Sequence, residues 1–132
     1  MEIKYAYTIL YVEDVEKTMN FYQNTFNFKQ KLLTPEKDYG EINSGETIIA
    51  FANLALVNSN FGSDFQVSRK NNKPFGLELA FTCPNVDELM NKAIKNGAEM
   101  LSEAAQKPWG QRVGYVTDLN GFIIEICSAI DN

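Results

Sequence analysis

The sequence contains no histidine. Imidazole is the usual general base in serine and cysteine hydrolases and a frequent ligand of catalytic metals. Its absence excludes Ser-His-Asp and Cys-His catalysis and every imidazole metal site. The sequence has only two cysteines, Cys83 and Cys127, and their spacing fits no zinc site. We expect both to be free, buried thiols in a reducing compartment.

The chain also lacks an excess of basic residues. It has 12 Lys and Arg against 17 Asp and Glu, a net charge of -5 and a pI near 4.7. This balance opposes binding to nucleic acid or to an anionic membrane and favours neutral or cationic ligands. No apolar run approaches the roughly 18 residues of a membrane span, and the start, MEIKYAYTIL, does not resemble a signal peptide. We therefore expect a cytoplasmic protein.

The first half of the chain has the pattern of one small α+β unit. Alternation predicts a strand over residues 3–12, with Tyr7 and Tyr11 on one face. Apolar residues at helical spacing then follow Asp14, a predicted helix N-cap. A strand over residues 29–33 comes next, and a hairpin turns at residues 43–45.

The second half repeats this pattern. Val15, Met19 and Asn20 recur at the same spacing as Val86, Met90 and Asn91, and the turn at residues 43–45 matches 119–121. An internal repeat is strong evidence for a fold made of two similar units. We predict a single α+β domain of two βαβββ modules: module one is 1–57, a polar linker pinned by Phe61 and Phe65 is 58–74, and module two is 75–132.

Three segments resemble the glyoxalase, bleomycin-resistance and extradiol-dioxygenase superfamily, also called vicinal oxygen chelate proteins. They are YTILYVEDVEKTMNFYQNTFNF, LELAFTCPNVDELMNKAIKNGAEM and PWGQRVGYVTDLNGFIIEI, and the segment PWGQR is closest to bleomycin-resistance proteins. The resemblance implies two βαβββ modules that form a cup-shaped, curved mixed sheet with the helices outside. It also implies a homodimer, in which strands of two chains complete each cup.

The resemblance further implies where a divalent metal would bind. The four ligand positions of the superfamily fall on Tyr7, on Ile49 or Ala50, on Glu78 and on Glu125. None of these is the usual histidine, so we expect no bound zinc, iron or nickel. The sequence therefore favours a binding protein over an enzyme.

Alternation places the two glutamates on the same side of their strands without appeal to the family. Glu78 shares a strand face with Ala80 and Thr82, and Glu125 lies opposite the more apolar face of its strand. Two carboxylates facing into a cup leave three roles open. They can bind an organic cation, hold Mg²⁺ or Mn²⁺ with waters, or hydrogen-bond to Arg112 or Tyr7 as part of the structure.

Aromatic residues supply the candidate walls of the cup. Trp109, the only tryptophan, lies in a Pro-Trp-Gly segment, and the resemblance implies that a planar ligand stacks on it. The other candidate wall residues are Tyr7, Tyr11, Phe51 and Tyr115, and for each of them ordinary packing within the sheet is an equal alternative.

Three functions remain open at this point. The first is the binding and sequestration of a cationic or aromatic antibiotic without a cofactor. The second is a metal-dependent lyase, isomerase or dioxygenase that uses Glu78 and Glu125. The third is a non-catalytic scaffold whose cup is filled by side chains.

Overall fold

The chain folds into two compact units of similar topology. The computed structural model describes residues 1–130, and the chain divides into Met1–Val67, which we call unit one, and Ser68–Asn132, which we call unit two. The predicted modules 1–57 and 75–132 each fall inside one unit, and the linker is divided between them.

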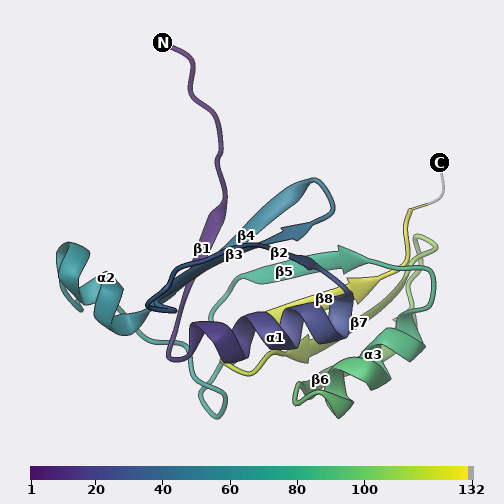
Figure 1. Cartoon of the computed structure of the whole chain (residues 1–132). Coiled ribbons are helices and arrows are strands. Elements are labelled where there is room, and N and C mark those ends of the chain that lie inside the picture. Colours follow the sequence, from purple (N-terminus) through teal and green to yellow (C-terminus); the bar gives the residue numbers. More distant parts are fainter. Residues whose placement is uncertain (131–132) are drawn as a thin grey trace. The chain divides into compact units, whose positions relative to one another are not determined.

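Each unit contains one four-stranded mixed sheet and one long helix (Figure 1). Unit one has the sheet order β1-β4-β3-β2, with β1 parallel to β4, and unit two has the equivalent order β5-β8-β7-β6. The two βαβββ modules predicted from the repeat are confirmed. In unit one the elements are β1 (Thr8–Val12), α1 (Val15–Phe26), β2 (Lys29–Leu33), β3 (Tyr39–Ser44), β4 (Thr47–Asn53) and α2 (Leu54–Phe61). In unit two they are β5 (Glu78–Thr82), α3 (Val86–Lys95), β6 (Glu99–Gln106), β7 (Arg112–Thr117) and β8 (Ile123–Cys127).

The two long helices begin in the same way. The Asp14 side chain accepts a hydrogen bond from the Lys17 backbone N–H at 3.0 Å, and the Asn85 side chain accepts one from the Glu88 N–H at 3.1 Å. Each cap satisfies a backbone donor that the first helical turn leaves unpaired, which stabilises a helix by about 1 kcal/mol. The predicted N-cap at Asp14 is confirmed.

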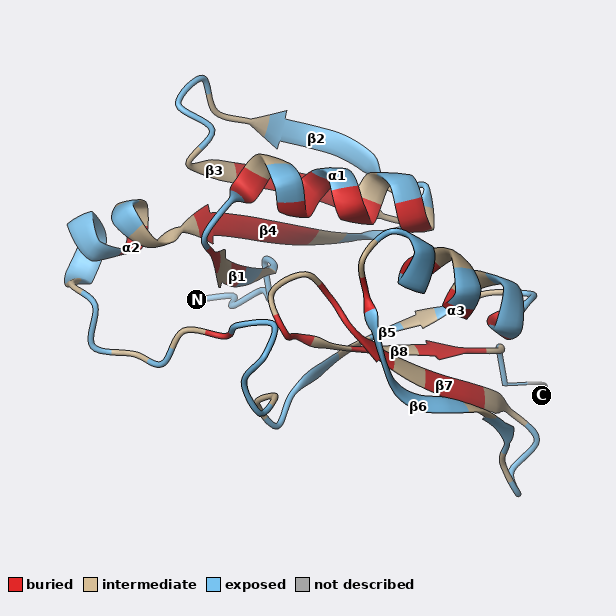
Figure 2. Cartoon of the chain, turned by 90° about the horizontal axis from the view of Figure 1, so that it is seen from below, coloured by how far each residue is buried: buried red, intermediate tan, exposed pale blue. Residues whose placement is uncertain are grey.

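The repeat extends to the packing of each helix on its sheet. Met19 of α1 lies against Gly40 of β3, and Met90 of α3 lies against Gly114 of β7. A Cβ atom added to Gly114 would be 2.9 Å from Met90 Cε and 3.1 Å from Ala104 Cα, so a larger residue would force the Met90 side chain to move. These contacts bury one face of β3, β4, β7 and β8, while the edge strand β6 stays exposed (Figure 2).

Two features of the first half differ from the prediction. The predicted strand over residues 3–12 is wrong for residues 3–7, because β1 begins at Thr8, opposite Ile49, and β4 soon turns away into its hairpin. Helix α2 was not predicted. Its signal is the cap at Asn53, whose side chain accepts from the Leu56 N–H at 2.9 Å.

The predicted linker is anchored at both ends. In unit one, Phe65 packs edge-on against Tyr11, with ring centroids 5.1 Å apart, and Phe61 lies against both rings. In unit two, the Ser68 hydroxyl donates to the Asn120 carbonyl at 2.8 Å. No helix within residues 1–130 has the length and hydropathy needed to cross a bilayer.

Candidate functional site

Glu78 and Glu125 lie on adjacent parallel strands of unit two. In the register of β5 and β8, Glu78 is opposite Ile123 and Glu125 is opposite Ala80. Gly114 contacts α3 and pairs with Ile126, so the next residues in these strands face away from the helix. We call this helix-free side the open face of unit two. It carries Glu78, Ala80, Thr82, Val113, Tyr115, Thr117, Ile123, Glu125 and Cys127.

The two carboxylates are close enough to interact. Partial burial and the negative charge of Glu125 both raise the pKa of Glu78. Neither carboxylate is ion-paired with a lysine or arginine anywhere in residues 1–130. The open face therefore carries negative charge that the described chain does not neutralise.

Tyr115 fixes the orientation of Glu125. These two residues are directly opposite each other in β7 and β8, and the Tyr115 hydroxyl donates to Glu125 Oε1 at 2.9 Å. That hydrogen bond, followed by partial burial, raises the pKa of Tyr115 to about 12. The hydroxyl therefore stays protonated at neutral pH and remains a donor to the carboxylate. The hydrogen bond from Tyr115 explains how the apolar strand β8 can hold a half-buried glutamate.

Arg112 does not take part in this arrangement. Its guanidinium donates to both carboxylate oxygens of Asp87, at 2.6 and 2.8 Å, on the exposed surface. The hypothesis that Arg112 donates a hydrogen bond to the inward carboxylates is wrong, because its guanidinium is paired with Asp87 in the first turn of α3. The donor to Glu125 is Tyr115 instead.

Both thiols of unit two are poor nucleophiles. Cys127 is buried, and its Sγ lies 3.6 Å from the Phe81 carbonyl oxygen. Burial, followed by a hydrogen bond to Glu125, raises the pKa of Cys127 to about 11, and burial also raises the pKa of Cys83. Since the thiolate is the reactive form, neutral pH disfavours covalent chemistry at either residue. Both cysteines are free, as expected, but only Cys127 is buried, whereas Cys83 is partly exposed.

The pH dependence of Cys127 labelling is expected to report its contact with Glu125. In a Cys83→Ser background, the rate of alkylation by iodoacetamide should rise steadily up to at least pH 9.5, because the thiol ionises near pH 11. Glu125→Gln removes a hydrogen bond and a negative charge that favour the protonated thiol of Cys127, so the pKa of Cys127 should fall. Labelling at pH 8 should then be faster by about threefold or more, given tenfold more thiolate for each pKa unit.

Glu78→Gln is the matched control for this measurement. Glu78 also raises the pKa of Cys127, but it is the weakest of the causes. Its replacement should change the rate much less than Glu125→Gln does. Equal rates for the parent and Glu125→Gln, measured by mass spectrometry, would show that Glu125 does not contact the thiol.

Unit one carries a different set at the corresponding positions. Ala50 is opposite both Ile9 and Glu41, as Glu125 is opposite both Ala80 and Tyr115. This register decides between Ile49 and Ala50 and makes Ala50 the counterpart of Glu125. The carboxylate of unit one lies one strand away, on Glu41.

Glu41 is held by its neighbours on the helix-free face of unit one. It is 9% exposed. The Tyr39 hydroxyl donates to its Oε2 at 2.6 Å, and Lys31 Nζ is 4.0 Å from Oε1. Burial, the hydrogen bond to Glu41 and a further one to Tyr7 together raise the pKa of Tyr39. Tyr39 and Glu41 were missed by the sequence reasoning, although the alternation of YGEINS places both on the side opposite Gly40 and Ile42.

The candidate aromatic residues have different environments. Phe51 is 0% exposed and packs against Tyr22 of α1, with ring centroids 5.3 Å apart. Its prediction as a wall residue is wrong, because it lies on the helix side of β4. Tyr11 packs against Phe61 and Phe65. Trp109 is 62% exposed in the turn between β6 and β7.

Trp109 is tied to the end of strand β8. Its Nε1–H donates to Gln111 Oε1 at 2.6 Å, and the Gln111 amide donates to the Ser128 carbonyl at 2.7 Å. Ser128 directly follows β8. Trp109 therefore lies beside the C-terminal end of β8, the strand that carries Glu125 and Cys127. A large ring that is mostly exposed at this place is available for stacking.

The four implied metal positions do not offer a set of metal ligands. Ala50 has no donor atom, and Tyr7 is hydrogen-bonded to Tyr39. Only Glu78 and Glu125 remain, and no three Cys, Asp or Glu side chains within residues 1–130 form a group that could hold a metal ion. Two carboxylates without imidazole or thiolate do not fit a zinc, iron or nickel centre.

Comparison with known proteins agrees with this architecture. The model of the glyoxalase-like domain family matches residues 5–131. A glyoxalase-related enzyme from Fulvimarina pelagi has a TM-score of 0.79 and 22% identity over 96% of this chain and 89% of its own. A glyoxalase/bleomycin resistance/dioxygenase family enzyme from Burkholderia phytofirmans has a TM-score of 0.74 and 17% identity over 93% of this chain and 96% of its own.

A third solved structure is the fosfomycin resistance protein FosX from Mesorhizobium loti. It has a TM-score of 0.68 and 14% identity over 98% of this chain and 94% of its own. At these identities the solved structures establish a shared fold. No curated protein matched the sequence. Because the family model spans nearly the whole chain, this protein belongs to the glyoxalase-like domain family.

Proposed function

We propose that this protein binds and sequesters a small organic molecule that carries a cationic group and a planar ring, such as a cationic or aromatic antibiotic. The observation that carries the proposal is the pair of carboxylates on the open face of unit two. Glu78 and Glu125 interact with each other, and neither has a cationic partner within residues 1–130. An organic cation placed between them would relieve this repulsion.

The chemistry of the remaining side chains favours binding over catalysis. Tyr115 and Cys127 both have raised pKa values and hold their protons at neutral pH. The face therefore offers fixed hydrogen-bond partners and negative charge, while neither the Tyr115 hydroxyl nor the Cys127 thiol is ionised to act as a base or nucleophile at neutral pH. Binding alone lowers the concentration of a free antibiotic by mass action.

Trp109 supplies the contact for the ring of the ligand. Its exposed indole lies beside the C-terminal end of β8. Stacking on an aromatic face contributes about 0.5–1.5 kcal/mol beyond the buried area. A ligand with a ring and an ammonium group would then contact both Trp109 and Glu125.

Titration with cationic aromatic compounds, bleomycin among them, tests this proposal. Binding should be seen by calorimetry and as a change in the fluorescence of Trp109. Glu125→Gln should weaken it by about 10- to 100-fold, as expected for loss of a charged hydrogen bond. Trp109→Ala should weaken it by about 3- to 10-fold. Added salt should weaken the contribution of Glu125 to the affinity much more than the contribution of Trp109, because salt screens partly exposed charges.

The sign of the pH dependence provides a further check. Affinity should fall as the pH is lowered and carboxylates take up protons, and because the pKa of Glu78 is raised the fall should begin at a higher pH than for an ordinary glutamate. Fosfomycin, an anion, is the matched control ligand and should bind weakly because the open face repels it. The proposal fails if no cationic compound binds more tightly than about 1 mM, or if binding is unchanged in both variants.

A further inference from the structure

An ion pair on the helix-free face of unit one has no counterpart in unit two. Lys31 is the extra residue of the bulge in β2, beside the point where β2 pairs with Glu41 of β3. A bulge can re-aim a side chain, and the Lys31 ammonium lies 4.0 Å from Glu41 Oε1. In unit two the corresponding bulge has Leu101 as its extra residue, and Tyr115 takes the place of Glu41. The fold itself therefore requires no charge at either position.

Glu41 is an expensive residue at this place. It is 9% exposed, and a carboxylate so far out of water is stable only when hydrogen-bond donors or a cation meet its oxygens. The Tyr39 hydroxyl donates to Oε2 at 2.6 Å. The distance of 4.0 Å from Oε1 to Lys31 Nζ is too long for a hydrogen bond, and no other group within residues 1–130 donates to Oε1. One oxygen of a nearly buried carboxylate is thus left without a donor.

Both ends of this ion pair can take a further partner. No fully buried side-chain oxygen in the described part of the chain lacks a hydrogen-bond partner, so Glu41 Oε1 is reachable from the surface. The side chain of Lys31 is 48% exposed, and its ammonium makes no hydrogen bond to any of residues 1–130. The unused acceptor and the unused donors are 4.0 Å apart. A group that both donates and accepts would satisfy the two together.

Apolar side chains flank the ion pair. One row across β1, β4, β3 and β2 consists of Ile9, Ala50, Glu41 and Leu32. Ile9 is 41% exposed and Leu32 is 43% exposed. A ligand held at Glu41 would therefore also cover apolar surface beside it, and this burial adds to its affinity.

We propose that this face of unit one binds a neutral molecule with an apolar chain through a primary carboxamide or a lactam. The amide carbonyl accepts a hydrogen bond from Lys31, and the N–H on the same side of the amide donates to Glu41 Oε1. The oxygen and nitrogen of an amide are about 2.2 Å apart, from the C=O and C–N bond lengths. Two hydrogen bonds of ordinary length therefore reach both residues across the gap.

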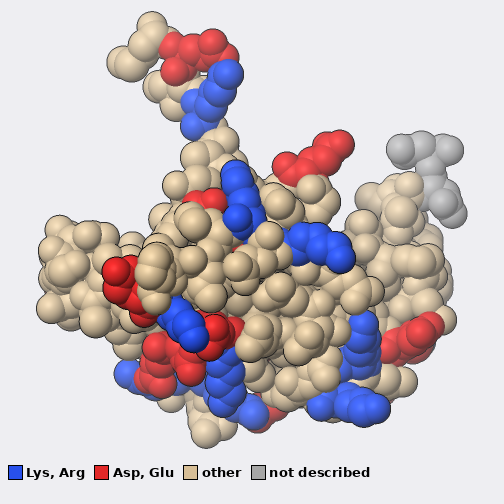
Figure 3. All heavy atoms as spheres, viewed as in Figure 1, with Lys and Arg blue, Asp and Glu red and all other residues tan. Residues whose placement is uncertain are grey.

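The charges around the pair favour a neutral ligand. Lys31 would repel an ammonium ion and Glu41 would repel a carboxylate, whereas an amide meets each residue with the complementary end of its dipole. In Figure 3 the lysines and arginines lie in several separate places with acidic side chains among them, and they form no continuous basic patch on that face. The site shares no residue with the one proposed on unit two, so it goes beyond the proposed function.

Titration with hexanamide, followed by the backbone amide signals in NMR spectra, tests the site. Hexanamide should bind with a Kd of about 1–10 mM, as expected for so small a ligand, and should shift signals of β2 and β3. N,N-dimethylhexanamide is the matched control ligand. It keeps the carbonyl but has no N–H, so it should bind about tenfold more weakly. Cationic aromatic compounds should instead shift signals of β7 and β8, so the two proposals succeed or fail separately.

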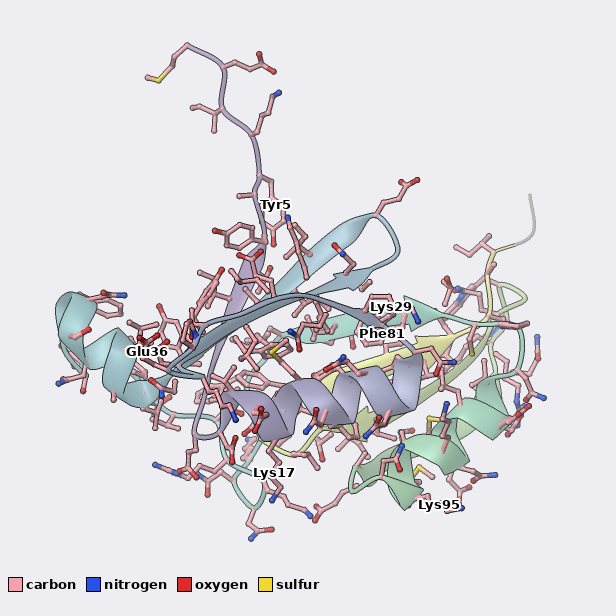
Figure 4. The ribbon with its side chains drawn as sticks, viewed as in Figure 1. Tyr5, Lys17, Lys29, Glu36, Phe81 and Lys95 are labelled. Atoms are coloured by element: carbon pink, nitrogen blue, oxygen red, sulfur yellow. The ribbon has the colours of Figure 1, made fainter. Side chains whose placement is uncertain are left out.

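Replacement of Lys31 provides the second test. Lys31→Met keeps the apolar stem and removes the ammonium donor, so hexanamide should bind about tenfold more weakly. The side chain is 48% exposed, so this variant should fold. Lys29→Met is the matched control at the first residue of the same strand (Figure 4) and should leave the affinity unchanged. The proposal is overturned if hexanamide at about 20 mM shifts no signal of β2 or β3, if the dimethyl amide binds equally well, or if both lysine variants have the same effect.

Discussion

Replacing Gly121 by alanine is expected to lower the free energy of unfolding by about 2–5 kcal/mol. Gly121 has a φ of +84°, a conformation that costs an L-residue about 1–2 kcal/mol. An added Cβ would also lie 2.8 Å from the Arg69 carbonyl carbon, and closer still to its oxygen. The contacted atoms belong to backbone, so the segment from Ser68 onward would have to move and lose its hydrogen bond to Asn120. Urea denaturation measures the loss.

The internal repeat supplies the control for this variant. Gly45 occupies the corresponding hairpin turn of unit one, with a φ of +75°, but an added Cβ meets nothing within 4 Å. Gly45→Ala should therefore cost only the conformational part, about 1–2 kcal/mol. If both substitutions cost the same, the contact with Arg69 does not hold the linker against the hairpin of unit two.

Much of the fold was predictable because the repeat expresses the same local physics twice. Asp14 and Asn85 cap helices in the same way, and Met19 and Met90 each occupy the space left by a glycine. Periodicity and capping are local properties, so the sequence reveals them. The end of a strand is not local. The first residues alternate like a strand, but β4 begins at Thr47, and in the register of Thr8 with Ile49 residues 1–5 lie beyond it and have no partner strand in unit one.

The candidate site was predictable to the extent that alternation determines it. Alternation placed Glu78 and Glu125 on one face, and the structure places both on the open face of unit two. Their partners depend on cross-strand register, which the sequence does not show. Tyr115 and Glu125 are ten positions apart in the chain and directly opposite in the sheet. Glu41 could not be found from the family positions alone. The position on β4 falls on Ala50, and Glu41 lies opposite it on the neighbouring strand β3.

Phe51 shows why an aromatic residue cannot be assigned to the wall of a site while the register of its strand is unknown. The residue next to it, Ala50, lies on the helix-free face of unit one, and a shift of one residue moves a side chain to the other face. Phe51 is therefore a core residue that packs on Tyr22. Phe51→Ala is expected to lower the free energy of unfolding by about 3–5 kcal/mol, because it removes a large buried ring and leaves a cavity. Chemical denaturation is the direct measurement.

Trp109→Ala is the matched control, since it also truncates an aromatic residue that was predicted as a wall. The indole is 62% exposed in a turn, so its loss should change the free energy of unfolding by less than about 1 kcal/mol. The two variants should therefore show opposite patterns. Phe51→Ala loses stability while folded molecules keep their ligand affinity, and Trp109→Ala keeps stability while losing affinity. A Phe51→Ala protein that is as stable as the parent but fails to bind ligand would return Phe51 to the binding face and would mean that the register of β4 is wrong.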